Sequence, residues 1–210
     1  MSRPTIARGI KNPPVCTFEE PSQGPAGKMS GECSMPQSGE TPAALRTAAI
    51  LSFCAIYALR GVEVRRVLIS DFDWINETFV VRRAKGGLIQ QFPLQYEVGE
   101  AVLRYLRYGR PKCYNRQIFV TLKPPYRPMN QCVMAALVRS RMKALKVVST
   151  RCGTHSLRHA CATELLRRGS SLVDIADFLG HRSIESVSVY ARLDKRSLRR
   201  VATFSLAGVR

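Results

Sequence analysis

The sequence predicts a mainly α-helical fold that carries one small antiparallel β-sheet. Two patterns indicate this class. From residue 41 onward, most segments repeat apolar residues at the three- and four-residue spacings of a helix that packs on a core. The stretch 78–94 instead has two β-prone runs separated by a Lys-Gly-Gly turn, which is typical of a hairpin.

Residues 1–40 differ from the rest of the chain in composition. They contain six of the 12 prolines and five of the 14 glycines, with few aliphatic residues and no periodicity. Such a segment cannot bury enough apolar surface to offset the chain entropy that is lost on ordering. We therefore expect residues 1–40 to be disordered and one folded domain to span residues 41–210.

The folded domain is expected to begin with two helices. Thr41-Pro42 is a typical helix start, because proline is favoured in the first turn. A largely buried helix follows over Ala43–Leu59, and a short one over Val62–Val67. The apolar run Thr47–Leu59 within the first helix is too short to span a bilayer, so no membrane protein is expected.

The hairpin and six further helices complete the predicted order. The strands of the hairpin are Thr78–Arg83 and Leu88–Leu94, joined by the turn Lys85-Gly86-Gly87. Thr154 and Ser171 are typical N-cap residues for two of the later helices. These helices are expected over Val98–Tyr108, Asn130–Leu145, His155–Arg168, Ser171–Gly180, 183–191 and 195–203.

The chain is strongly basic. Its 33 Lys and Arg residues outnumber its 15 Asp and Glu residues, which gives a formal net charge of +18. Residues 1–40 hold four basic and four acidic residues, so the whole excess falls on residues 41–210. A domain this basic repels itself unless it has a polyanionic partner. Nucleic acid is the leading interpretation, and an anionic membrane surface is the second.

The cysteine pattern argues against a disulfide scaffold and against a zinc site. The seven cysteines form no CxxC pair, and their odd number indicates free thiols in a reducing cytoplasm. His155 and His159 are four residues apart, with Cys152 and Cys161 nearby, but position 156 is serine rather than the glutamate of a zinc-protease helix. Because the cysteine spacing also fits no zinc finger, we expect no metal.

Three short motifs can carry chemistry on a phosphate. Arg60 lies between the first two predicted helices, three residues before Glu63. In His155-Ser-Leu-Arg158-His159, the first and fourth residues share a helix face, so both can address one anion. Leu179-Gly180-His181 is followed nine residues later by Tyr190.

The order of these motifs resembles the tyrosine recombinase (phage integrase) family. Leu-Arg-x-x-Glu, a lysine in a hairpin turn, His-x-Leu-Arg-His, Leu-Gly-His and a tyrosine follow one another over roughly residues 41–203. The Leu-Gly-His-Arg-Ser segment is similar to integrases of bacterial mobile elements. The resemblance implies the catalytic-domain fold of that family. It also implies a site-specific DNA recombinase that cuts and rejoins strands through a 3′-phosphotyrosyl intermediate without metal or cofactor.

The resemblance also implies a role for each catalytic residue. Arg60 and Arg158 supply planar charged forks that match the non-bridging oxygens of the scissile phosphate. His155 and His181 donate hydrogen bonds to the same phosphate, and the family gives His155 a part in proton transfer. Tyr190 is the nucleophile.

Three more residues complete the implied site. Lys85 corresponds to the family's general acid for the 5′-oxygen. The alternative interpretation is that Lys85 is an ordinary solvated lysine in a turn. Glu63 is expected to orient Arg60 or His155 without contacting DNA. His159 is expected to support the site from behind the catalytic residues, although taken alone it is more typical of a structural histidine.

Basic residues outside the motifs are expected to contact DNA phosphates. Such contacts position a protein on the duplex but do not read its sequence. For each residue the alternative is an ordinary solvated surface cation. The expected contacts are Arg65, Arg66, Arg82, Arg83, Lys143 and Lys146.

The 40 residues before the predicted domain cannot form the core-binding domain that precedes the catalytic domain in full-length members of the family. Two hypotheses follow: an active DNA strand transferase, or a truncated, non-catalytic DNA-binding remnant or accessory protein of a mobile element. In either case the expected partner is double-stranded DNA. The C-terminal tail is expected to join protomers into a tetramer on DNA, with a monomer in its absence. The expected location is the cytoplasm, on the nucleoid when DNA is bound.

Overall fold

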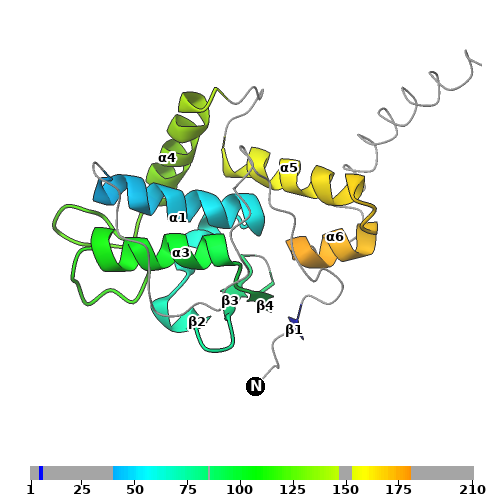
Figure 1. Ribbon diagram of the computed structural model, residues 1–210, viewed down its shortest axis with the longest axis horizontal. Coiled ribbons are helices and arrows are strands. Elements are labelled where there is room, and N and C mark those ends of the chain that lie inside the picture. The colour runs from blue at the N-terminus through cyan, green and yellow to red at the C-terminus, as the bar shows by residue number, and fades with distance from the viewer. Residues whose placement is uncertain (1–4, 7–39, 85, 147–152, 181–210) are drawn as a thin grey trace, which may run out of the picture.

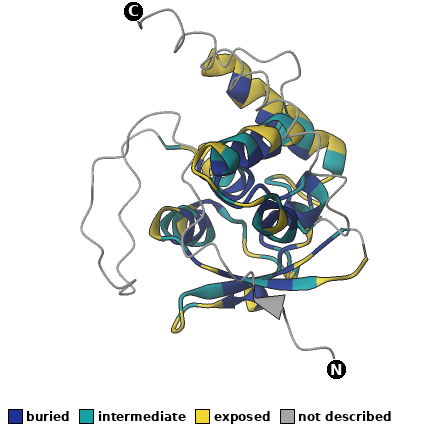
Figure 2. Cartoon of the chain, turned by 90° about the vertical axis from the view of Figure 1, so that its right-hand side faces the viewer, coloured by how far each residue is buried: buried dark blue, intermediate teal, exposed yellow. Residues whose placement is uncertain are grey.

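The computed structural model describes residues 5–6, 40–84, 86–146 and 153–180. Helices stack over one face of a small sheet, as Figures 1 and 2 show from two directions. The predicted class, mainly α with a small antiparallel sheet, is therefore confirmed. No described helix is long and apolar enough to cross a membrane.

Helix α1 (Pro42–Ile56) forms the centre of the helical layer. The helix begins at the predicted Thr41-Pro42 start, and Thr41 is its N-cap, because the Thr41 hydroxyl oxygen accepts a hydrogen bond from the Ala44 amide at 3.2 Å. The helix ends three residues before the predicted Leu59, since Ala58 adopts a left-handed conformation with φ 51°. The resulting turn leads directly to Arg60, which is the N-cap residue of α2 (Gly61–Arg66).

The sheet has the strand order β1-β4-β3-β2. The predicted hairpin forms its centre, with β3 (Thr78–Arg82) antiparallel to β4 (Ile89–Pro93). Two short strands that were not predicted extend it: β2 (Phe72–Asp73) pairs with β3, and β1 (Thr5–Ile6) pairs in parallel with β4. Thr5–Ile6 forms a strand although it lies in the segment expected to be disordered, while the domain boundary at residue 41 stays a prediction.

An aromatic core joins α1 to the sheet. The Phe53 ring of α1 is fully buried and lies 5.4 to 6.2 Å from four other aromatic rings, those of Tyr57, Phe72, Phe79 and Phe119. Edge-to-face contacts at such distances add to the stabilisation from burial itself. This packing fixes the C-terminal end of α1 on the sheet, and with it the turn that carries Arg60.

The remaining elements follow the predicted order, with one corrected cap. Helix α5 begins at Thr154 itself, and its N-cap is Gly153 with φ 157°, so the prediction that Thr154 is the cap is wrong. Ser171 caps α6 as predicted, and its hydroxyl oxygen accepts from the Asp174 amide at 3.1 Å. The predicted helices over 183–191 and 195–203 lie outside the described residues. The other elements are a 3₁₀ turn (Ile69–Asp71), α3 (Tyr96–Arg104) with a π-helical turn (Tyr105–Gly109), α4 (Gln131–Ala144), α5 (Thr154–Arg167) and α6 (Leu172–Leu179).

Candidate active site

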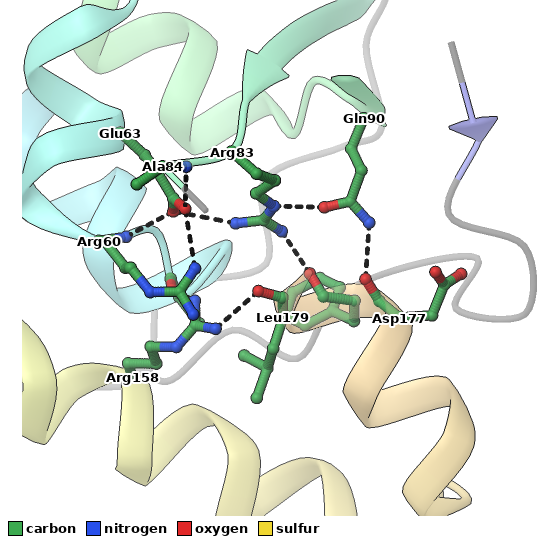
Figure 3. A network of polar contacts seen from close by, with 10 residues as sticks. Arg60, Glu63, Arg83, Ala84, Gln90, Arg158, Asp177 and Leu179 are labelled. Carbon is green, nitrogen blue, oxygen red and sulfur yellow. Dashed lines mark hydrogen bonds and ion pairs between the residues drawn. The ribbon is translucent and has the colours of Figure 1, made fainter. Parts of the chain in front are cut away.

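Two of the predicted catalytic residues, Arg60 and Arg158, meet at the turn between α1 and α2, because Arg158 Nη1 donates to the carbonyl oxygen of Ala58, two residues before Arg60. Arg60 stands at the start of α2 and Arg158 in the second turn of α5, so the fold brings together residues far apart in sequence. In the view of Figure 3, both side chains point into the region between α2, α5 and the end of α6. Because like charges repel, this arrangement is suited to an anion that both groups can share.

Glu63 holds Arg60 in place. The Arg60 Nη1 atom donates to Glu63 Oε1 at 2.9 Å, and the Arg60 backbone amide donates to Glu63 Oε2 at 2.8 Å. The Arg60 side chain remains 19% exposed, so this contact does not enclose it completely. The structure thus shows the contact that was expected between Glu63 and Arg60.

Glu63 is buried, and its carboxylate also accepts from Arg83 Nη1 at 3.0 Å and from the Ala84 amide at 3.2 Å. Burial by itself raises the pKa of the Glu63 carboxyl. The Arg83 charge and the hydrogen bonds from Arg60 and Ala84 outweigh burial, so that the net pKa is lowered. Glu63 is therefore ionised at neutral pH.

Arg158 is buried, with 4% of its surface exposed. Its Nη1 atom donates to the Ala58 carbonyl oxygen at 2.8 Å, and its Nη2 atom donates to the Leu179 carbonyl oxygen at 2.6 Å. The left-handed turn at Ala58 and the end of α6 therefore both orient the guanidinium. Both acceptors are neutral, so these two bonds hold the group without neutralising its charge.

The structure does not place Arg83 on the surface, where its predicted contact with DNA would lie: its side chain is fully buried, and all three guanidinium nitrogens bind acceptors inside the protein. Its Nε atom donates to Gln90 Oε1, its Nη2 atom donates to the Phe178 carbonyl oxygen, and its guanidinium carbon lies 5.3 Å from the centre of the Phe92 ring. The signal was present in the sequence. Side chains alternate along a strand, so the pattern that buries Phe79 and Val81 also turns Arg83 inward.

Helix α5 also carries the two predicted site histidines, His155 and His159. His155 lies on α5 one turn before Arg158 and is exposed, as is His159. Partial desolvation, and then the charges of His155 and Arg158, lower the pKa of His159. Three predicted catalytic residues lie outside the described part of the chain: Lys85, His181 and Tyr190.

The other predicted DNA contacts lie at or near the surface. Arg66, Lys143 and Lys146 are exposed, and Arg65 is partly buried. Arg82 is exposed, and its Nη1 atom forms an ion pair with Asp71 Oδ1 at 2.7 Å. Their contacts with DNA stay predictions.

Within the described ranges, no group of three or more His, Cys, Asp or Glu side chains is placed to hold a metal ion. The described cysteines are free thiols, and two of them, Cys54 and Cys161, are buried. Burial, and to a lesser extent the Glu63 charge, raises the pKa of Cys54 to about 12. This thiol is therefore protonated at neutral pH and belongs to the core.

The fold is that of the catalytic domain of tyrosine recombinases. The crystal structure of XerA recombinase superposes with a TM-score of 0.63 at 25% identity, over 79% of this chain and 60% of that one. The XerH site-specific recombinase, bound to its palindromic difH substrate in a post-cleavage complex, gives a TM-score of 0.65 at 21% identity. That match covers 80% of this chain and 48% of the XerH chain.

The chain belongs to the phage integrase family, which it matches over residues 33–197. It is 43% identical over 163 residues to the putative integrase/recombinase y4gC of Sinorhizobium fredii, over 78% of this chain and 84% of y4gC. It is 35% identical over 164 residues to y4rA of the same organism, over 78% of this chain and only 40% of y4rA. Tyrosine recombinase XerC of Halalkalibacterium halodurans is 27% identical over 201 residues, over 92% of this chain and 63% of XerC.

Proposed function

We propose that this chain is the catalytic domain of a site-specific DNA recombinase that cuts and rejoins strands through a 3′-phosphotyrosyl intermediate. The observation that carries the proposal is the convergence of Arg60 and Arg158, one held by a buried carboxylate and the other by two carbonyl oxygens. Membership of the phage integrase family supports it independently.

The two arginines have the chemistry to bind a scissile phosphate. Each guanidinium presents a planar fork of donors that matches two oxygens of a phosphodiester. Because both forks are fixed before DNA arrives, they can stabilise the extra charge on the phosphate in the transition state without reorganising. His155, one turn before Arg158, and His181 are proposed to donate to the same oxygens.

Tyr190 is the proposed nucleophile. Its ordinary pKa is about 10, so its proton must be removed locally as the oxygen attacks phosphorus. The new bond joins Tyr190 to the 3′-phosphate, and the bond from phosphorus to the 5′-oxygen breaks. Lys85 is proposed to give a proton to that leaving oxygen. Attack by a 5′-hydroxyl then reverses the step, so resealing needs no ATP. Arg60 and Arg158 are proposed to supply the positive charge, so the step needs no metal for that purpose.

The proposed partners follow from the same chemistry. The substrate is double-stranded DNA, and exchange between two duplexes needs several active sites together. We propose a tetramer on DNA whose protomers are joined through the C-terminal tail, and a monomer without DNA. We place the protein in the cytoplasm, on the nucleoid when it is bound.

The test is covalent capture on nicked DNA. The full chain is mixed with a pool of randomised duplexes, each nicked so that the strand released by cleavage diffuses away and traps the enzyme on its DNA. A covalent adduct that is absent with Tyr190→Phe supports the proposal. If the wild-type chain binds DNA but forms no adduct with any duplex, it is a non-catalytic DNA-binding protein and the proposal fails.

A further inference from the structure

The C-terminal end of α6 is held by side chains from three separate segments. The last carbonyl oxygens of a helix have no partner within the helix and need other donors. Here three consecutive carbonyl oxygens each accept a hydrogen bond from a different element, as Figure 3 shows. Gln90 of β4 donates to Asp177 O, Arg83 at the end of β3 to Phe178 O, and Arg158 of α5 to Leu179 O.

Arg83 is the centre of this arrangement. One edge of its guanidinium donates to Phe178 O, its Nη1 atom donates to Glu63 at 3.0 Å, and its Nε atom donates to Gln90. Glu63 in turn binds Arg60 at 2.9 Å. The side chains of Arg83 and Glu63 are both fully buried, so this connection from Arg60 to α6 is shielded from water.

Arg83 also sets the path of the chain as it leaves α6. Gly180 follows the helix with φ 63°, and a Cβ atom added to it would lie 2.6 Å from Arg83 Nε. Such a distance leaves no room for any side chain, so the Arg83 stem packs directly against the Gly180 backbone. The residue after Gly180 is His181, which is one of the proposed catalytic residues.

We infer that Arg83 is a positioning residue that fixes Arg60 and the chain leaving α6 relative to each other. The guanidinium group of Arg83 binds acceptors in three directions, on α2, on the hairpin and on α6. A lysine ammonium on a flexible stem cannot bind these three acceptors with the same geometry. The inference rests on the proposed function, in which Arg60 and His181, the residue after Gly180, must reach the same phosphate for the cleavage step.

The test compares Arg83→Met and Arg83→Lys with Arg110→Met. Arg110 is a suitable control because it too donates to three acceptors, the carbonyl oxygens of Asn115, Gln117 and Ile118, although it is partly rather than fully buried. Removing either arginine costs one charge and three hydrogen bonds, but Arg110 touches none of the residues around Glu63. For each variant we would measure the free energy of unfolding, the DNA affinity, and the single-turnover rate of adduct formation at saturating DNA.

Loss of Arg83 is expected to lower the rate at saturating DNA and leave the affinity nearly unchanged. A displacement of about 1 Å at a reacting group typically costs about 10²-fold in rate, and we expect a loss of that size for Arg83→Met. Arg110→Met is expected to unfold more easily than the wild type but to cleave at the wild-type rate. Equal slowing by both variants, or wild-type cleavage by Arg83→Lys, would overturn the inference.

Hydrogen exchange tests the inference without activity. The Ala84 amide binds Glu63 and the Gly180 amide binds the Asp177 carbonyl oxygen, so both report on what Arg83 holds. Both amides are expected to exchange faster in Arg83→Lys, which keeps the charge, and in Arg83→Met, but not in Arg110→Met. If the wild-type chain forms no adduct, the proposed function fails, but the exchange measurement still decides the role of Arg83. Unchanged exchange at both amides would refute the inference that Arg83 is a positioning residue.

Discussion

At the scale of single residues, Glu63 determines how the charges of the site are balanced. It is 1% exposed and serves two arginines at once, Arg60 at the edge of the site and Arg83 behind it. A buried carboxylate without such partners would be neutral at pH 7. Because Glu63 is ionised, it accepts two hydrogen bonds from Arg60, which fix the position of that residue. The same negative charge allows Arg83 to be buried in its charged form.

Replacing Glu63 by glutamine is expected to destabilise the fold in a pH-dependent way. At neutral pH the loss should be about 3–5 kcal/mol, because Arg83 would remain buried without a counter-charge. Folding lowers the pKa of Glu63, so its contribution is full above the ordinary pKa of glutamate and is lost as pH falls through the folded value. Urea unfolding at several pH values should show the gap between wild type and Glu63→Gln narrowing on acidification. A gap that stays constant would contradict this account.

Arg158 is expected to matter more for cleavage than for binding. Removing one preorganised donor that stabilises developing charge typically costs about 10²–10³-fold in rate, and we expect a loss in this range for Arg158→Ala. The rate of adduct formation on nicked DNA measures it. Urea unfolding of the same variant serves as the control, since Ala58 O and Leu179 O also lose a donor. A rate within the wild-type range in a folded variant would remove Arg158 from the site.

The sequence predicted part of this site and missed the rest for a physical reason. The sequence indicated Arg60 and His155 as the two possible partners of Glu63, and the structure shows the contact with Arg60. The burial of Arg83 could have been predicted from strand alternation, but a preference for charges on the surface outweighed it. Its partners on α6 could not be predicted, because backbone carbonyl oxygens leave no mark in a sequence.

At the scale of elements, a local capping signal placed two helix starts correctly and missed a third, because Gly153, not Thr154, caps α5. Thr41 and Ser171 cap α1 and α6 through their own hydroxyl oxygens, which is a property of adjacent residues. The early end of α1 depends on Ala58 in a left-handed conformation, which alanine does not favour locally. Strands β1 and β2 have two residues each, and pairing with distant partners, not local preference, defines them.

Gly180 is expected to tolerate substitution less well than Gly169, although both have positive φ. Gly169 has φ 83° and no atom within 4 Å of an added Cβ, so Gly169→Ala should cost only the backbone strain, about 1–2 kcal/mol. Gly180→Ala adds an overlap with Arg83 and should cost measurably more in the free energy of unfolding. The extra cost should shrink in the Arg83→Met background, which a double-mutant cycle would measure. Equal costs at both glycines would show that Arg83 does not crowd Gly180.

At the scale of the whole molecule, the excess of positive charge is the property that the sequence predicts most directly. The net charge of +18 follows from composition alone, and the placement of the excess after residue 40 follows from counting. The fold class was also predictable, because most of the core comes from helices with regular apolar spacing. The convergence of Arg60 and Arg158 was predictable only through the family resemblance, since nothing local relates the two residues.

DNA binding by this chain is expected to be weak, largely independent of sequence and strongly dependent on salt. Each phosphate that a cation neutralises releases condensed counterions, so log K falls linearly with log salt concentration. Contact with about six phosphates gives a slope of roughly −5, measured by fluorescence anisotropy on a duplex over a range of salt. A slope near zero would contradict a phosphate-binding face.

Removing a single exposed lysine should change the slope of log K against log salt concentration by the amount expected for one phosphate contact. Lys143 lies in the last turn of α4 with its side chain exposed, and loss of one phosphate contact lowers the magnitude of the slope by about 1. Lys143→Ala is therefore expected to weaken binding equally on unrelated duplexes and to flatten the slope by that amount. Arg110→Met removes the same charge from a side chain that is bound to backbone carbonyl oxygens, so its slope should equal that of the wild type. If both variants flatten the slope alike, binding depends on total charge and no particular face of the domain contacts DNA.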